Sequence, residues 1–134
     1  MLVVDDDPGM RAILREFLAR EGFEVAEEPS AERALAVLAI EQHPEVVILD
    51  NQMPGLKGVD ALALVRSRWP ELPVILITAF GGPRVEEQAR RLGAACYVEK
   101  PFRVSELIVQ LKRLTGRRDA PGARATEQDS RTDG

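Results

Sequence analysis

Residues 46–50 read Val46-Val47-Ile48-Leu49-Asp50, and a loop that contains Met53-Pro54-Gly55 follows them. Four apolar side chains in a row, most of them β-branched, are typical of a strand that is buried on both faces. Such strands belong to parallel sheets, in which helices cover both faces. Because the strand stops at a carboxylate, this one segment predicts a class of fold and also places a charged group at the end of a buried strand.

Similar apolar runs recur on either side of this segment. Together the runs predict strands at Leu2–Val4, Phe23–Ala26, Val46–Leu49, Val74–Ile77 and Ala95–Val98. Between them, apolar residues recur at the three- and four-residue spacing of an amphipathic helix. Caps and breakers predict the helix ends: Asp7 and Pro8 before the first helix and Gly22 after it, Ser30 before the second, Pro70 after the third, residues 84–92 for the fourth, and Ser105 before the last.

Strand and helix thus alternate five times in about 115 residues. Because crossovers between parallel strands are right-handed and helical, this alternation predicts an α/β fold with a doubly wound parallel sheet. We expect residues 1–115 to form one domain. Residues 116–134 contain only three alanines as hydrophobic residues, and we expect a disordered tail or the start of a linker there.

Charge and composition exclude several classes of protein. The tail holds equal numbers of basic and acidic residues, so the net charge of −4 belongs to residues 1–115 and argues against a nucleic-acid-binding surface. No apolar stretch approaches the roughly 20 residues of a membrane span, and the start lacks the basic and apolar pattern of a secretory signal, so we expect a cytoplasmic chain. A single cysteine and a single histidine, Cys96 and His43, argue against a disulfide, a cysteine metal cage and a catalytic triad.

Polar residues follow four of the predicted strands. They are Asp5, Asp6 and Asp7 after the first strand, Asp50 after the third, Thr78 after the fourth and Lys100 after the fifth. Ligands of open parallel sheets bind outside the carboxyl ends of the strands, so we expect these groups to converge there. Crowded carboxylates suit Mg²⁺, while a lysine and a hydroxyl suit phosphate oxygens, and a carboxylate can itself accept a phosphoryl group.

Four blocks of this sequence resemble the receiver domain of two-component response regulators. They read VVDDDPGMRAIL (3–14), VVILDNQMPGLKG (46–58), VILITA (74–79) and YVEKPF (97–102), and the resemblance covers residues 2–115. It implies a flavodoxin-like fold with strand order 2-1-3-4-5 and five helices. It also implies a phosphoprotein of a phosphorelay, which catalyses its own phosphorylation and dephosphorylation but is not an enzyme with a separate substrate.

The resemblance further implies a role for individual residues. Asp50 is the phosphoacceptor, and Thr78 and Lys100 contact the phosphoryl group. Asp5, Asp6, Asp50 and the backbone carbonyl of Gln52 hold Mg²⁺, with Asp6 favoured as the direct ligand of the acidic pair. Tyr97 acts with Thr78 as the switch, and the Lys100–Pro101 peptide bond is cis. The signal is expected on the surface of the fourth helix, the fifth strand and the last helix.

Two side chains are expected to flank the path of the water that hydrolyses the aspartyl phosphate. Phe80 is apolar and large enough to block this water, whereas Gln52 either orients the water or fills space. Because positioning of the attacking group matters in phosphoryl transfer, we expect a longer-lived phosphate than in chemotaxis-type receivers with polar side chains at both positions.

The expected partners are a histidine kinase or a histidine phosphotransfer protein, and then either a downstream protein or an output domain outside this chain. We expect no membrane or direct nucleic-acid binding, and a monomer or weak dimer.

Two alternatives stay open: a haloacid-dehalogenase-type phosphatase, in which Asp5 would be phosphorylated and Asp7 would be its second acid, and a degenerate receiver that only binds partners. The intact set of candidate residues argues against the second alternative.

Overall fold

The structure is a computed structural model that describes residues 1–40, 44–79 and 81–116. The chain divides into two compact units, Met1–Phe102 and Arg103–Gly134, which are described separately. His43, Phe80 and the predicted tail beyond residue 116 lie outside the described residues. None of the helices in the described part of the chain is long and apolar enough to cross a membrane.

The first unit is built on a parallel sheet with strand order β2-β1-β3-β4-β5. The strands are β1 (Leu2–Val4), β2 (Ala26–Glu28), β3 (Val47–Asp50), β4 (Val74–Thr78) and β5 (Cys96–Glu99). All residues of β1, β3 and β4 are buried, as expected for strands covered on both faces. The predicted α/β class and the predicted strand order are therefore confirmed.

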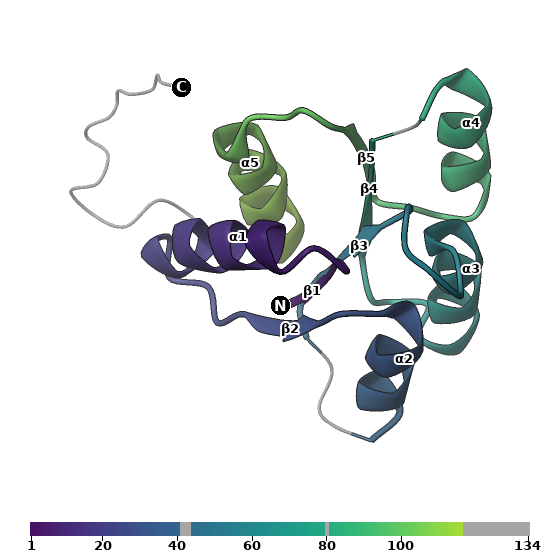
Figure 1. Cartoon of the computed structure of the whole chain (residues 1–134), viewed down its shortest axis with the longest axis horizontal. Coiled ribbons are helices and arrows are strands. Elements are labelled where there is room, and N and C mark those ends of the chain that lie inside the picture. The colour runs from purple at the N-terminus through teal and green to yellow at the C-terminus, as the bar shows by residue number, and fades with distance from the viewer. Residues whose placement is uncertain (41–43, 80, 117–134) are drawn as a thin grey trace. The chain divides into compact units, whose positions relative to one another are not determined.

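Helices lie on both faces of this sheet (Figure 1). They are α1 (Pro8–Arg20), α2 (Ala31–Ile40), α3 (Gly58–Arg68) and α4 (Pro83–Arg91). The second unit contains one further helix, α5 (Val104–Thr115). Figure 1 shows α2, α3 and α4 on one side of the strands and α1 on the other. Alternate strand residues such as Val47 and Leu49 form one core cluster with side chains of α2, α3 and α4.

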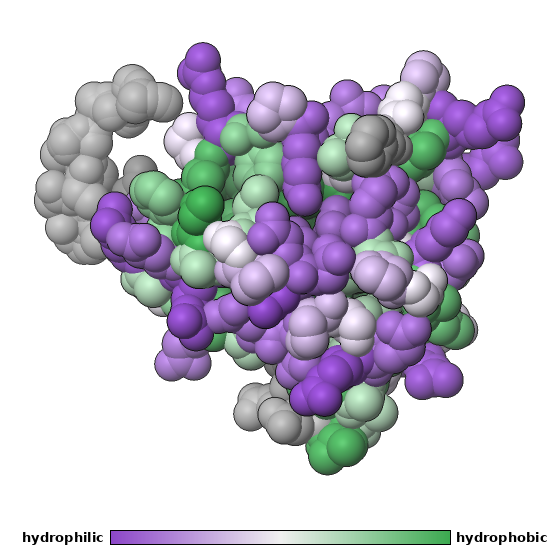
Figure 2. Space-filling view, in the orientation of Figure 1, coloured by the Kyte–Doolittle hydropathy of each residue, from purple (hydrophilic) through white to green (hydrophobic). Residues whose placement is uncertain are grey.

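The surface contrasts with this interior. Figure 2 shows hydrophilic side chains over most of the visible face, with apolar residues in small groups. Among the large apolar side chains of the described residues, Ile40 is the most exposed, at 84%. The central strand residues Val3, Ile75 and Leu76 are almost completely buried. Burial of apolar area thus fixes the position of the strands, and with them the edge at which their carboxyl ends meet.

Local hydrogen bonds explain where the first two helices begin. The side chain of Asp7 accepts a hydrogen bond from the Gly9 N–H at 2.9 Å, and Ser30 Oγ accepts one from the Arg33 N–H at 3.1 Å. Both are N-cap bonds, which satisfy backbone donors that the helix leaves open. The prediction for Ser105 is wrong, because α5 begins at Val104 and its N-cap is Arg103, which makes no side-chain cap bond.

The prediction for the second strand is also wrong, because Phe23 belongs to the end of α1 and not to β2. The Phe23 N–H donates to the Leu18 carbonyl at 3.1 Å, and the Gly22 N–H donates to the Ala19 carbonyl at 3.0 Å. With Gly22 at a φ of 90°, these bonds form a Schellman-type helix end, in which an apolar residue after the glycine packs back on the helix. Pairing with β1 starts only at Ala26.

Hydrogen bonds join the two ends of the loop between β3 and α3. The Gly58 N–H donates to the Asn51 carbonyl at 3.3 Å, and the Val59 N–H donates to Asn51 Oδ1 at 2.9 Å. Gly58 has no side chain at this contact: a Cβ there would lie 2.5 Å from Asn51 Cα and 2.7 Å from the Asp50 carbonyl oxygen. The backbone at Asp50 is therefore held by a contact that only glycine permits.

We expect Gly58→Ala to lower the free energy of unfolding by about 1–3 kcal/mol, the usual cost of overpacking against atoms that cannot move aside. Gly9→Ala is the matched control, because Gly9 also lies in a first helical turn and its added Cβ would meet only the Asp7 side chain, at 3.3 Å. Its effect should stay below about 1 kcal/mol. Urea unfolding of the two variants measures the difference, and equal stabilities would contradict the proposed contact.

Candidate functional site

Three carboxylates meet at the carboxyl edge of the sheet. Asp5 follows β1 and Asp50 ends β3, and each is only 4% exposed, while Asp6 is exposed. One oxygen from each of the three lies within 4.8 Å of the others. Hard cations such as Mg²⁺ take oxygen ligands of this kind and relieve the repulsion between the carboxylates, so the cluster fits a divalent cation.

Asp7 has a different place from the other two aspartates of its run. Its side chain caps α1, and only its backbone N–H reaches the cluster, where it donates to Asp5 Oδ1 at 2.9 Å. A phosphatase of the haloacid-dehalogenase type would need this carboxylate beside the nucleophile. The structure therefore gives Asp7 a capping role and favours the receiver interpretation of the cluster.

Lys100 brings a positive charge to the carboxylates. Its Nζ lies 3.5 Å from Asp5 Oδ2 and 3.7 Å from Asp50 Oδ1. Its backbone N–H donates to the Thr78 carbonyl at 2.8 Å, which ties the end of β5 to the end of β4. The Lys100–Pro101 peptide bond is cis. An ammonium group at this point is placed to meet a phosphate oxygen next to Asp50.

The environment of Asp50 disfavours the charged form of its carboxyl group. Burial, together with the charge of Asp5, raises the pKa of Asp50 from 3.8 to about 6. Lys100 and the Gln52 N–H, which donates to Asp50 Oδ1 at 3.4 Å, oppose this rise in the pKa. Desolvation and like charge thus outweigh the attractive contacts, and a bound cation would offset this imbalance.

Thr78, the last residue of β4, is completely buried. Its hydroxyl donates a hydrogen bond to Gln52 Oε1, and the Ala79 N–H donates to the same oxygen at 3.2 Å. Gln52 follows Asp50 by two residues, so its side chain joins the loop after β3 to the end of β4. The sequence indicated that Gln52 lies near the site, but it did not indicate these bonds.

Tyr97 on β5 lies next to Gly81 and Gly82, the two residues directly before α4. Its hydroxyl donates to Glu99 Oε2 at 3.0 Å and accepts from the Gly82 N–H at 3.3 Å, and Gly82 also donates to Glu99 Oε2 at 3.1 Å. Burial and the Glu99 carboxylate raise the pKa of Tyr97. A Cβ at Gly81 would lie 1.8 Å from the Tyr97 hydroxyl and 3.0 Å from Thr78 Cγ2, so both side chains pack against this glycine.

Arg11 is a further residue near the site, and its role was not predicted from the sequence. Its guanidinium donates to the backbone carbonyl of Asp5 and to Glu27 Oε1 on β2. Glu27 is also paired with Arg15, at 2.7 Å. The position of Arg11 in the first turns of α1 was a partial signal, since this helix starts beside the acidic run. The partner on β2 depends on strand register and could not be found from spacing.

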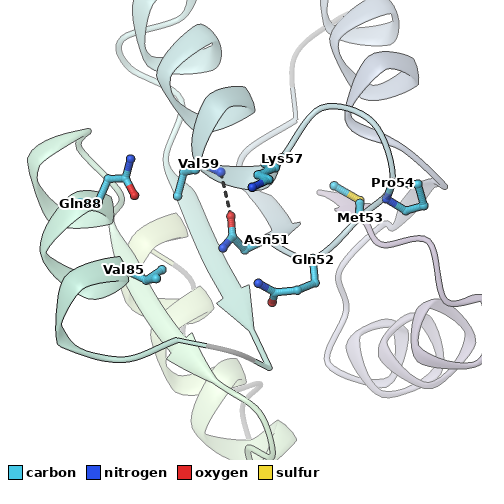
Figure 3. A pocket seen from close by; sticks show the side chains of 8 residues that line it. All are labelled: Asn51, Gln52, Met53, Pro54, Lys57, Val59, Val85 and Gln88. Atoms are coloured by element: carbon cyan, nitrogen blue, oxygen red, sulfur yellow. Dashed lines mark hydrogen bonds between the residues drawn. The ribbon is translucent and has the colours of Figure 1, made fainter.

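A pocket of about 520 Å³ lies beside these residues, between the loop after β3 and helix α4. Figure 3 shows its lining, in which Gln52 extends from the loop and Val85 and Gln88 face it from α4. The lining residues are Asn51, Gln52, Met53, Pro54, Lys57, Val59, Val85 and Gln88. Gln52 thus borders both the pocket and Thr78.

The structure brings the candidate site residues together, except for one that it does not describe. Asp5, Asp6, Asp50 and Lys100 form one charged cluster, Gln52 joins Thr78 to this cluster, and Tyr97 approaches Thr78 across Gly81. Phe80 lies outside the described residues, so its place beside the attacking water stays a prediction.

Known proteins are similar to this chain in both sequence and fold. The family model of the response regulator receiver domain matches residues 1–112. The response regulator protein FleR of Pseudomonas aeruginosa is 44% identical over 108 residues, which cover 81% of this chain and 23% of FleR. The probable transcriptional regulatory protein TcrX of Mycobacterium tuberculosis is 35% identical over 117 residues, which cover 87% of this chain and 50% of TcrX.

Solved structures agree with these matches. The receiver domain of NtrX from Brucella abortus superposes with a TM-score of 0.79 at 34% identity, over 86% of this chain and 97% of that domain. The BeF3-activated DrrB receiver domain gives a TM-score of 0.79 at 29% identity, over 87% of this chain and 96% of that domain. The chain belongs to the response regulator receiver domain family. It spans between about a quarter and a half of the length of the curated relatives named above.

We expect Asp50→Asn to stabilise the fold when no divalent cation is present. A raised pKa means that the folded state binds more protons than the unfolded state between pH 3.8 and about 6, so the wild-type chain loses stability as the pH rises through this range. Asparagine has no such charge. In EDTA, urea unfolding at pH 8 should therefore show a gain of about 1–3 kcal/mol for Asp50→Asn, and a smaller gain at pH 5. Asp60→Asn, on the exposed surface of α3, is the control. A gain that does not depend on pH would contradict this account.

Proposed function

We propose that this receiver domain accepts a phosphoryl group on Asp50 from a phosphohistidine of a histidine kinase or histidine phosphotransfer protein. The observation that carries the proposal is the cluster of Asp5, Asp6 and Asp50, whose oxygens lie within 4.8 Å of one another beside the Lys100 ammonium. In the transfer, a carboxylate oxygen of Asp50 forms a bond to phosphorus as the bond from phosphorus to the histidine nitrogen breaks.

Each residue of the cluster has a separate role in this transfer. Asp5, Asp6, Asp50 and the backbone carbonyl of Gln52 would hold Mg²⁺, which supplies charge neutralisation for the carboxylates and the incoming phosphoryl group. Lys100 Nζ lies between Asp5 and Asp50 and so can follow a phosphoryl oxygen by a small movement. The Thr78 hydroxyl and the Ala79 N–H point to the same place, and both are hydrogen-bond donors.

Phosphorylation would change the partners of Thr78. A hydroxyl bonds more strongly to a charged phosphoryl oxygen than to a neutral amide oxygen, so the phosphate draws Thr78 and the loop after β4 toward Asp50. Tyr97 and Glu99 hold the other end of that loop through Gly82, and their bonds must adjust to the movement. We propose that the surface of α4 and β5 carries the change to a partner, while the contribution of α5 stays a prediction.

The relatives suggest what kind of partner acts after this domain is phosphorylated. FleR, at 44% identity, is matched by this chain over only 23% of its length, and TcrX over 50%, so both carry further sequence beside their receiver regions. We therefore propose that the signal passes from this domain to a downstream protein or to an output domain. Water would later remove the phosphate from Asp50, which returns the domain to its resting state.

Acetyl phosphate should label Asp50 when Mg²⁺ is present. Intact-mass analysis is expected to show one phosphoryl adduct on the wild-type chain and none on Asp50→Asn, because an amide oxygen is a poor nucleophile at neutral pH. Asp60→Asn, which changes an exposed aspartate of α3, should be labelled like the wild type. An adduct that persists in Asp50→Asn would refute the assignment of the phosphoacceptor.

Mg²⁺ should stabilise the folded chain, because it binds the native cluster and not the unfolded chain. At a hundredfold excess over its Kd the gain is about 2.7 kcal/mol, which thermal melts at matched ionic strength can detect. Asp6→Asn should remove most of the shift. Asp7→Asn should retain it, since asparagine is an equally good N-cap and Asp7 lies outside the cluster. An equal shift in both variants would argue against a site at Asp5, Asp6 and Asp50.

A further inference from the structure

The side chain of Gln52 occupies the hydrogen-bond donors that the proposed function assigns to the phosphoryl group. Its Oε1 accepts from the Thr78 hydroxyl and from the Ala79 N–H, the latter at 3.2 Å. Its backbone N–H donates to Asp50 Oδ1 at 3.4 Å, so the same residue also touches the phosphoacceptor. We infer that Gln52 is an internal competitor, whose amide oxygen stands where a phosphoryl oxygen would bind and must leave before Asp50 can be phosphorylated productively.

The geometry indicates that the Gln52 amide oxygen and a phosphoryl oxygen would compete for the same donors. Thr78 is 0% exposed, and its hydroxyl and the adjoining Ala79 N–H converge on a single acceptor atom. An amide oxygen and a phosphoryl oxygen are both acceptors, and one position between two converging donors holds only one of them. The amide must release the two donors before the phosphoryl group can use them, and this delays the arrival of the phosphoryl group. Because the bonds to a charged oxygen are about twice as strong, the phosphoryl group keeps both donors after the transfer.

The length of the glutamine side chain is essential to this role. Asparagine at the same position would draw its amide oxygen back by about 1.5 Å, the length of one carbon–carbon bond. Hydrogen bonds weaken steeply over such a distance, so asparagine would leave the two donors free for the phosphoryl group. The glutamine side chain also has room to leave, since it borders the pocket of about 520 Å³ in front of α4 (Figure 3).

This inference rests on the proposed function, because it takes Asp50 as the phosphoacceptor. It gives Gln52 a part different from the two expected from the sequence, in which the side chain orients the hydrolytic water or fills space. The competition acts before phosphorylation and not after it. It therefore predicts slower capture of small phosphodonors and weaker binding of beryllofluoride, which imitates the phosphoryl group.

The test compares Gln52→Met with the wild type. Methionine has a similar length but lacks the amide oxygen, so it fills the space without satisfying Thr78 and Ala79. We expect Gln52→Met to bind beryllofluoride about tenfold more tightly in the presence of Mg²⁺, and to be phosphorylated by acetyl phosphate correspondingly faster. Gln52→Asn should show a gain of similar size. Gln88→Met is the matched control, because Gln88 lines the same pocket from α4, across from Gln52 (Figure 3).

Two further measurements separate competition from a general loosening of the loop. The Kd of Mg²⁺ alone is measured for each variant, because a change there would report a disturbed metal site and not a freed pair of donors. A double-mutant cycle with Thr78→Val then tests the hydroxyl: the gain from Gln52→Met should shrink at least threefold in the Thr78→Val background, since one of the contested donors is gone. A gain that is unchanged in that background would overturn the inference.

Hydrogen exchange gives an outcome that does not depend on phosphorylation. The Ala79 N–H should be protected in the wild type and should exchange faster in Gln52→Met, whereas it should be unchanged in Gln88→Met. An unprotected Ala79 N–H in the wild type, or unchanged beryllofluoride affinity in Gln52→Met with normal Mg²⁺ binding, would refute the competitor role alone. Failure of the wild type to bind beryllofluoride at all would refute the proposed function and this inference with it.

Discussion

Asp5, directly after β1, and Asp50, at the end of the neighbouring strand β3, carry carboxylates that are each only 4% exposed. The other contacts at this edge of the sheet depend on the repulsion between these two buried charges. Lys100 is drawn between them, and backbone N–H groups of Asp7 and Gln52 bind one oxygen of each carboxylate. These contacts leave the pKa of Asp50 at about 6, so they compensate the cost of burial only in part. A bound cation would offset the remaining imbalance, and this imbalance supports the proposal that Asp50 is the reactive carboxylate of the site.

The sequence was sufficient for the fold because burial decides it. The run from Val46 to Leu49 is apolar throughout, and such runs permit few arrangements other than a parallel sheet between helices. The errors came where local hydrogen bonds outweigh hydrophobicity. Phe23 is apolar and looks like the start of a strand, but the bond from its N–H to Leu18 assigns it to the end of α1. Ser105 is a good capping residue, but α5 starts one residue before it.

The candidate site was predictable to the extent that it depends on strand ends. Asp50, Thr78 and Lys100 were placed by the rule that carboxyl ends of parallel strands meet at one edge. The contacts of Gln52, Tyr97 and Glu99 were not predictable, because they depend on side-chain rotamers and on the path of the loops between elements. Arg11 could not be connected to Glu27 either, since that contact depends on how α1 lies against β2.

The register of the sheet has a consequence for the order in which this site comes into being. Asp50 pairs with Ile77, and Thr78 pairs with Glu99, so the groups around Asp50, the proposed phosphoacceptor, come from strands that are far apart along the chain. Contacts of such high sequence separation form late, after the loops between them have closed. A cation that binds these groups would therefore find few of its ligands in place in the folding transition state. It would retard unfolding more than it would speed folding, and so would lengthen the lifetime of the native sheet.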